Sequence, residues 1–280
     1  MRLSDCHNIE DFRRLAKQRL PWPVFDYIDG AADDELTKAR NTAAFDEVDL
    51  VPDVLAGVEK IDTACTIMGR RSELPLVLSP TALQRAFHRD GEKAVARAAA
   101  KFGVWFGISS LATHSIEEIA ALTTASKLFQ LYVHKDKGLN TSMIERCKAS
   151  SFDALALTVD TIVSGKRERC LRSGFTTPTR FSASSLWSYA TRPRWTLDYV
   201  FGPKFRLPNL DGYVSEGSGK AVSIQDYFNT MLDTNMDWDT AARIRQDWGG
   251  TFALKGVMSA ADARRAVEIG ADAIWISNHG

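Results

Sequence analysis

The chain has 280 residues, of which 45% are hydrophobic and 25% are charged, and its formal net charge is zero. This composition is that of an ordinary globular protein, and the zero net charge gives no reason to expect a nucleic-acid partner. The four cysteines show no C-x-x-C spacing, which argues against a zinc site or a disulfide framework and favours the cytoplasm. The N-terminus lacks the apolar core of a signal peptide, and no run approaches the roughly 20 apolar residues that span a bilayer.

The first 70 residues are predicted to form a helical N-terminal cover. An amphipathic stretch at 9–20 comes first, followed by PWPVFDYIDG and then by a charged helix that starts near Asp33. This segment precedes the first strand signal, so we expect it to pack over the strands that follow.

Six short apolar runs recur from residue 74 onward, with amphipathic stretches between them. Most of these runs lack strict alternation, which is typical of strands that are buried on both faces of a parallel sheet. The runs are LPLVLS (74–79), VWFGIS (104–109), KLFQLYV (127–133), ALALTV (154–159), TFALKGV (251–257) and AIWIS (273–277).

Helix-start signals lie between these runs. Ser115 and Ser259 each stand three residues before an acidic residue in the manner of a helix cap, and Asp90 opens an Ala-rich helix that ends at Gly103. The alternation predicts βαβ units and an α/β fold. A TIM (β/α)8 barrel domain over 1–280, with about six of eight strands present, fits best. A doubly wound open sheet is the alternative, because periodicity does not separate the two.

Polar residues close every predicted strand. In TIM barrels the active site lies at the C-terminal ends of the strands. The residues at these ends are Ser79 to Ala82, Ser109 and Ser110, Gln130 and Tyr132, Thr158 to Asp160, Lys255, and Ser277 to His279. Loops often begin with polar residues, but six strands that do so together favour a site.

This set of side chains is suited to moving protons and hydride. His279 can act as a general base, and Asp160 can fix its tautomer. Lys255 places a positive charge where an anion develops, while Gln130 and Thr158 offer neutral hydrogen bonds to a heterocycle. From the residues alone, the cofactor stays open.

Six short motifs occur in a set order along nearly the whole chain. They are FDYIDGAA (25–32), SPTA (79–82), QLYV (130–133), TVD (158–160) with GKRE (165–168), LKGV (254–257) and SNHG (277–280). With these motifs the chain resembles the FMN-dependent 2-hydroxy-acid dehydrogenases and oxidases, and its closest resemblance is to bacterial L-lactate and mandelate dehydrogenases. The resemblance implies oxidation of an L-2-hydroxy acid, with L-lactate expected first, to the 2-keto acid. It leaves hydride and carbanion mechanisms open.

The resemblance also implies roles for individual residues. His279 would be the base and Asp160 its support, Tyr27 would bind the substrate carboxylate, Tyr132 would bond near the substrate oxygen, and Arg167 would add a positive charge near the substrate. Without the resemblance, both tyrosines could be packing aromatics and the arginine a solvated one. The residues expected to line the FMN ring are Pro80, Thr81, Ala82, Ser109, Gln130, Thr158, Lys255 and Ser277.

The family pattern continues beyond SNHG, with an arginine for the substrate carboxylate, two further strands and phosphate-binding segments. The chain is therefore expected to be C-terminally truncated, with an alternative that it is a non-catalytic barrel fragment. A Schiff-base aldolase that uses Lys255 is a third interpretation.

A long loop insertion is expected at 165–235, after the fourth strand. The segment from Lys166 to Arg206 contains nine basic residues but only two acidic ones, and aromatic residues alternate with the basic ones. This composition is typical of surfaces that rest on lipid headgroups. The hypothesis is peripheral contact with the inner membrane through 176–215 and transfer of electrons to quinone or another acceptor. A disordered or subunit-contact loop is the alternative, and homo-oligomerisation follows only from the family.

Overall fold

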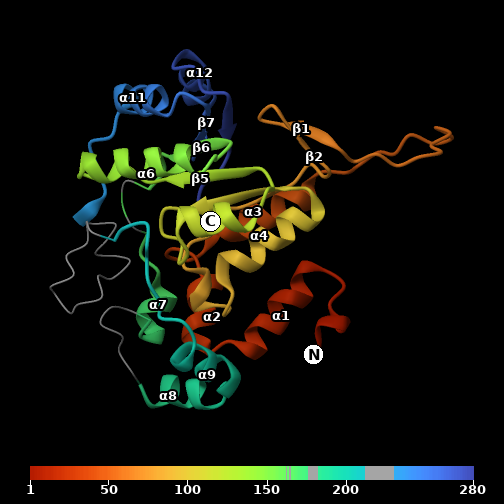
Figure 1. The fold of residues 1–280 in the computed structure, drawn as a ribbon. Helices are drawn as coiled ribbons and strands as arrows, with labels where there is room; N and C mark the ends of the chain where they lie inside the picture. The colour runs from red at the N-terminus through yellow and green to blue at the C-terminus, as the bar shows by residue number, and fades with distance from the viewer. Residues whose placement is uncertain (162, 164, 176–181, 212–229) are drawn as a thin grey trace.

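The core of the chain is a curved, fully parallel sheet (Figure 1). The computed structural model describes all residues except 162, 164, 176–181 and 212–229. The strands are β3 (Val77–Leu78), β4 (Trp105–Ser109), β5 (Lys127–Leu131), β6 (Ala154–Thr158), β7 (Thr251–Lys255) and β8 (Ala273–Trp275). All six predicted strands are thereby confirmed, with shorter bounds.

The order of the strands decides between the two candidate folds. Neighbours in the sheet follow one another in the sequence, from β3 through to β8, and every pairing is parallel. A doubly wound sheet would reverse direction at a switch point, whereas a barrel proceeds one way around its axis. The sheet is therefore six consecutive strands of the TIM-barrel type.

Helices alternate with the strands and form the outer layer. They are α4 (Gly91–Phe102), α5 (Ile116–Leu122), α6 (Lys137–Ala149), α11 (Trp238–Trp248) and α12 (Ala260–Glu268). The capping box at Ser115 and the cap at Ser259 are formed as predicted, and Gly103 ends α4 in the left-handed conformation. Asp90 precedes α4 but its side chain makes no cap; it pairs with Arg97 instead.

Burial on both faces explains why the strands read as apolar runs. Phe106 and Phe129 are fully buried in the layer that includes Ala96 of α4 and Met143 of α6. On the opposite face, Trp105 belongs to a smaller cluster that lines the inside of the curved sheet. The sheet thus separates two apolar layers, and polar side chains gather beyond its strand ends.

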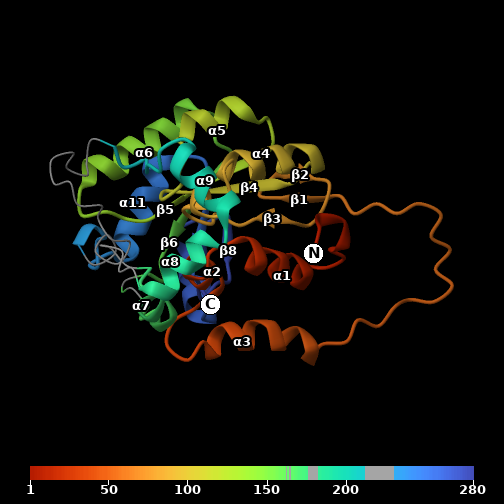
Figure 2. The same cartoon turned by 90° about the horizontal axis from the view of Figure 1, so that it is seen from below.

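The N-terminal segment is helical only in its first part. Its helices are η1 (Leu3–Asp5), α1 (Ile9–Arg19), α2 (Trp22–Asp29), α3 (Leu36–Ala43) and η2 (Ala44–Glu47). Residues 48–64 then form an extended excursion away from the body, best seen in Figure 2, and lead into the antiparallel hairpin of β1 (Cys65–Ile67) and β2 (Arg70–Ser72). The expectation of a helical cover over 1–70 was wrong beyond Glu47. Pro52 lacks an amide donor and Gly57 has a φ of 63°, so this stretch does not continue a helix.

The predicted insertion between β6 and β7 contains three described helices: α7 (Glu168–Ser173), α8 (Ala183–Ala190) and α9 (Pro193–Phe201). Helix α7 packs against α2, which brings the insertion against the N-terminal helices. Parts of the proposed membrane segment, 176–181 and 212–215, lie outside the described residues.

Candidate active site

Three ionisable side chains meet at the C-terminal ends of β6, β7 and β8. Nδ1 of His279 lies 2.7 Å from Oδ2 of Asp160. Nζ of Lys255 lies 3.2 Å from Nε2 of the same imidazole and donates to Oγ of Ser277 at 3.1 Å. The carboxylate therefore assigns the Nδ1–H tautomer, and Nε2 is left with the lone pair that a general base needs.

The backbone allows this close approach. Gly256 has a φ of 108°, and a Cβ at that position would lie 2.5 Å from Cγ of Asp160. Only glycine fits between the end of β7 and the carboxylate. Oδ1 of Asp160 is buried and has no hydrogen-bond partner within the described part of the chain, so it is available to a ligand.

Burial makes Lys255 less basic. It lowers the pKa of Lys255, and the nearby charge of Asp160 opposes that shift. The imidazole of His279 is more open, with 37% of its side chain exposed against 15% for Asp160. The group that is expected to meet a substrate is thus the accessible member of the cluster.

A second, uncharged row crosses three strands beside this cluster. Oγ of Ser109 donates to Oε1 of Gln130 at 2.9 Å, and Nε2 of Gln130 donates to Oγ1 of Thr158 at 2.7 Å. All three side chains are buried. The row offers both donors and acceptors along one line, which suits the polar edge of a flat heterocycle.

The loop after β3 closes the same end of the sheet. Pro80 packs on β4 so tightly that a Cβ at Gly107 would lie 2.9 Å from its Cδ. Thr81 is exposed and accepts a hydrogen bond from Gln84, and Ala82 is partly buried. The structure thus places every predicted ring-lining residue at one end of the sheet.

Tyr27 and Arg167 form one unit at the rim. The Arg167 guanidinium lies 4.8 Å from the centre of the Tyr27 ring and donates to the carbonyls of Tyr27 and Gly30. Arg167 is therefore not a solvated surface residue. It closes the C-terminus of α2, which carries Tyr27, and its contacts with helix carbonyls favour a cation there.

The second tyrosine is also buried toward the charged cluster. Burial raises the pKa of Tyr132, with the charges of Asp160 and Tyr27 acting in the same direction. Burial likewise raises the pKa of Tyr27, and Arg167 opposes it. Both phenols therefore stay protonated at neutral pH and can donate hydrogen bonds.

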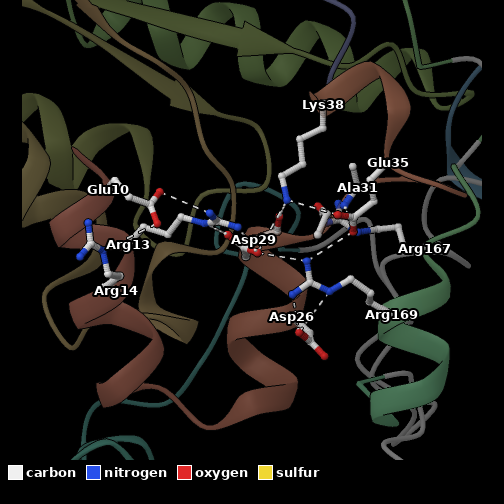
Figure 3. Close-up of polar contacts among 11 residues, drawn as sticks. Glu10, Arg13, Arg14, Asp26, Asp29, Ala31, Glu35, Lys38, Arg167 and Arg169 are labelled. Atoms are coloured by element: carbon white, nitrogen blue, oxygen red, sulfur yellow. Dashed lines mark hydrogen bonds and ion pairs between the residues drawn. The ribbon is translucent and has the colours of Figure 1, made fainter. Parts of the chain in front are cut away.

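An ion-pair network, which the sequence analysis missed, supports this rim (Figure 3). Arg169 contacts Asp26 at 2.5 Å and Asp29 at 3.0 Å, and Arg13 contacts Asp29 at 2.5 Å. Lys38 adds a contact from α3. The network fastens α1, α2 and α3 to α7. The signal for this network in the sequence was weak: Asp26 and Asp29 belong to the motif at 25–32, and Arg169 directly follows the motif at 165–168.

Tyr27 lies between two members of this network. Burial by itself would raise the pKa of Asp29, but hydrogen bonds from Arg13 and Arg169 outweigh burial and lower this pKa to about 2. The network thus fixes the turn of α2 from which the Tyr27 ring reaches the site. No group of metal-ligating side chains is found among the residues that the structure describes.

The His/Asp/Lys cluster and the neutral hydrogen-bonding row lie at the C-terminal ends of the strands, where TIM-barrel enzymes carry their active sites, so the chain has the site of a barrel enzyme. A family model described as FMN-dependent dehydrogenase matches residues 16–280. The L-lactate dehydrogenase of Caulobacter vibrioides is 38% identical over 96% of this chain and 70% of its own length. Glycolate oxidase of Spinacia oleracea is 34% identical over 98% of this chain and 68% of its own length.

A solved structure agrees with these sequence relatives. The crystal structure of the monotopic membrane protein (S)-mandelate dehydrogenase superposes with a TM-score of 0.91 at 33% identity, covering 99% of this chain and 73% of the other. The chain belongs to the FMN-dependent dehydrogenase family, and its cofactor is FMN. It spans between 66% and 73% of the length of the relatives named here and of a further L-lactate dehydrogenase relative.

The residues present fit this cofactor. The flavin ring has a hydrogen-bonding edge that matches the Ser109–Gln130–Thr158 row, and it gains negative charge on reduction, which Lys255 can balance. Oδ1 of Asp160, for which no described residue provides a hydrogen bond, is a buried polar atom that a bound ligand would satisfy. Across the described residues, no helix has the length and apolar character to cross a membrane.

Proposed function

We propose that this chain oxidises an L-2-hydroxy acid to the 2-keto acid, with L-lactate as the first candidate and mandelate-like acids as the second. The observation that carries the proposal is the contact of 2.7 Å between Nδ1 of His279 and Asp160, which leaves Nε2 of the partly exposed imidazole as the basic nitrogen, 3.2 Å from Nζ of Lys255. Relatives named for lactate, glycolate and mandelate support the substrate class.

His279 is the proposed base. Its Nε2 accepts a proton from the substrate, either from the hydroxyl group or from C2, and Asp160 stabilises the resulting imidazolium. Bound FMN would supply the acceptor for the two electrons that the substrate loses. Tyr27 and Tyr132 donate hydrogen bonds to the substrate carboxylate and oxygen, because both phenols are protonated at neutral pH. Arg167 holds the Tyr27 ring in place, and its guanidinium adds a positive charge near the substrate carboxylate.

Anaerobic flavin reduction tests this function. The chain is reconstituted with FMN, and flavin absorbance is followed after addition of L-lactate, (S)-mandelate or glycolate. We expect bleaching with at least one L-2-hydroxy acid and loss of bleaching in His279→Gln. A flavin-bound protein that no 2-hydroxy acid reduces would contradict the proposal. Trapping by borohydride with a keto acid would instead indicate Schiff-base chemistry at Lys255.

We also propose that α8 and α9 rest on a lipid surface. Trp187 is 71% exposed, Val200 63% and Phe201 81%, and Arg194 lies within the same helical pair. Exposed aromatic residues next to basic ones suit the headgroup layer. The similar mandelate dehydrogenase is described as a monotopic membrane protein. A quinone in the membrane would then be the electron acceptor.

Flotation with vesicles separates this surface from a subunit contact. The chain and a Trp187→Ser/Phe201→Ser variant are mixed with phosphatidylcholine vesicles that contain phosphatidylglycerol. We expect the wild type to float and the variant to stay at the bottom, while a Phe45→Ser variant, with its exposed ring on η2, floats like the wild type. Equal flotation of all three would rule out this surface as the lipid contact.

A further inference from the structure

A fully buried carboxylate lies outside the cluster described above. Glu92, in the first turn of α4, has no exposed surface. A buried charge is costly unless hydrogen bonds satisfy it. The proposed reaction does not use Glu92, so its burial requires another explanation.

Glu92 accepts hydrogen bonds from two different loops. Oε1 accepts from the backbone N–H of Thr113 at 2.9 Å and from that of Gln84 at 3.3 Å. Oε2 accepts from Oγ1 of Thr113 at 2.6 Å and lies 2.7 Å from Nδ1 of His114. Gln84 belongs to the loop after β3, and Thr113 and His114 belong to the loop after β4. One carboxylate therefore joins these loops.

Both loops lead directly to residues expected at the flavin. The Gln84 side chain donates to Oγ1 of Thr81 at 2.8 Å. In the other loop, the N–H of Leu111 donates to Oγ of Ser109 at 3.1 Å, and the carbonyl of Leu111 accepts from the N–H of Leu83 at 3.2 Å. Glu92 is thus linked to Thr81 through Gln84, and to Ser109 through the segment from Thr113 to Leu111.

Glu92 is ionised at neutral pH. Burial by itself would raise its pKa, but hydrogen bonds from His114 and Thr113 outweigh burial and leave the pKa below its usual value. Hydrogen bonds to a charged acceptor are about twice as strong as neutral ones. A neutral glutamine at this position would keep the size of the side chain but would present an N–H to some of the same donors.

We propose that Glu92 is a positioning residue that holds the loops after β3 and β4 at the spacing FMN requires. The proposal rests on the proposed flavin contacts of Thr81 and Ser109. It predicts that loss of the Glu92 charge weakens cofactor binding although Glu92 does not touch the cofactor, since the two loops then keep the Leu83–Leu111 bond but lose the charged acceptor that they share.

Titration of the apoprotein with FMN tests this role through quenching of flavin fluorescence, without any 2-hydroxy acid. We expect Glu92→Gln to weaken FMN binding by about tenfold, the effect of one charge-assisted hydrogen bond. Visible circular dichroism of the bound flavin should also change. Glu145→Gln is the matched control, because Glu145 pairs with Lys148 within α6, on the exposed surface of that helix. It should bind FMN like the wild type.

A purely structural role would give a different pattern. Glu92→Gln would then lower the melting temperatures of apoprotein and FMN-bound protein equally and leave the affinity unchanged, which would overturn the proposal. If that variant does not fold, Thr113→Val removes the 2.6 Å contact to Glu92 and the 3.3 Å bond from the N–H of Arg85, both of which join the two loops. An unchanged FMN affinity in this variant would also overturn the proposal. A wild-type chain that binds no FMN would instead overturn the proposed flavin contacts themselves.

Discussion

Substitution of Asp160 by asparagine is the sharpest test of the proposed active site. Asparagine keeps the size of the side chain but removes the charge that faces Nδ1 of His279 at 2.7 Å. Two unit charges about 4 Å apart interact by about 1 kcal/mol in water and by about 4 kcal/mol at an effective dielectric constant near 20. Because the His279 side chain is 37% exposed, an intermediate value of about 2 kcal/mol is appropriate.

This energy acts only when the imidazole carries the substrate proton. It therefore lowers the barrier rather than the ground state, and 2 kcal/mol corresponds to about 30-fold in kcat/KM. The assay is stopped-flow reduction of bound flavin by the preferred 2-hydroxy acid without oxygen. Asp247→Asn, on the exposed side of α11, is the control and should react like the wild type. If Asp160→Asn reduced its flavin within twofold of the wild-type rate, the pairing would have no catalytic role.

Three further outcomes follow from the charged groups around the site. Burial lowers the pKa of Lys255, so the buried charge destabilises the folded chain at neutral pH, and this cost disappears as pH rises toward about 10.5. Lys255→Met should therefore raise the melting temperature of the apoprotein more at pH 7 than at pH 10 in scanning fluorimetry. Arg169→Met removes the contacts to Asp26 and Asp29 and should cost about 2 kcal/mol in urea unfolding, and it should raise KM more than it lowers kcat because Tyr27 loses its support. The pKa of Asp29 is about 2 in the folded chain, so wild-type stability should fall as pH drops from 3.8 to 2, and Asp29→Asn should flatten that fall in acid titrations followed by circular dichroism. The Lys255 prediction is wrong if Lys255→Met raises the melting temperature equally at both pH values. An unchanged KM in Arg169→Met would contradict the second prediction, and parallel acid titration curves of Asp29→Asn and the wild type would contradict the third.

The local elements of this fold could be read from the sequence. Strands buried on both faces must be apolar throughout, so β4 to β7 stand out as short hydrophobic runs, and the caps at Ser115 and Ser259 need only neighbours three residues away. Parallel strands place their C-terminal ends together, which is why the polar residues that close the runs predicted a site. The helical cover ends earlier than predicted because Pro52 and Gly57 do not favour a helix.

Other features depend on contacts that the sequence does not encode locally. Asp160 and His279 are 119 positions apart, and their contact exists only because the sheet curves in one direction from β6 to β8. Without the family resemblance, Arg167 is one of several charges in a basic stretch of the sequence, whereas in the folded chain it packs on the Tyr27 ring.

By itself, the sequence determined the strands, most of the helices, the family motifs and the polar residues at the strand ends, because each depends on burial or on hydrogen bonds between near neighbours. The tertiary structure decided the order of the strands, the ion-pair network around Asp29 and the buried contacts of Glu92. Those depend on which distant segments the curvature of the sheet brings within a few ångströms. Hydrogen bonds and ion pairs form only over such short distances, so their partners could be identified only after the chain had folded.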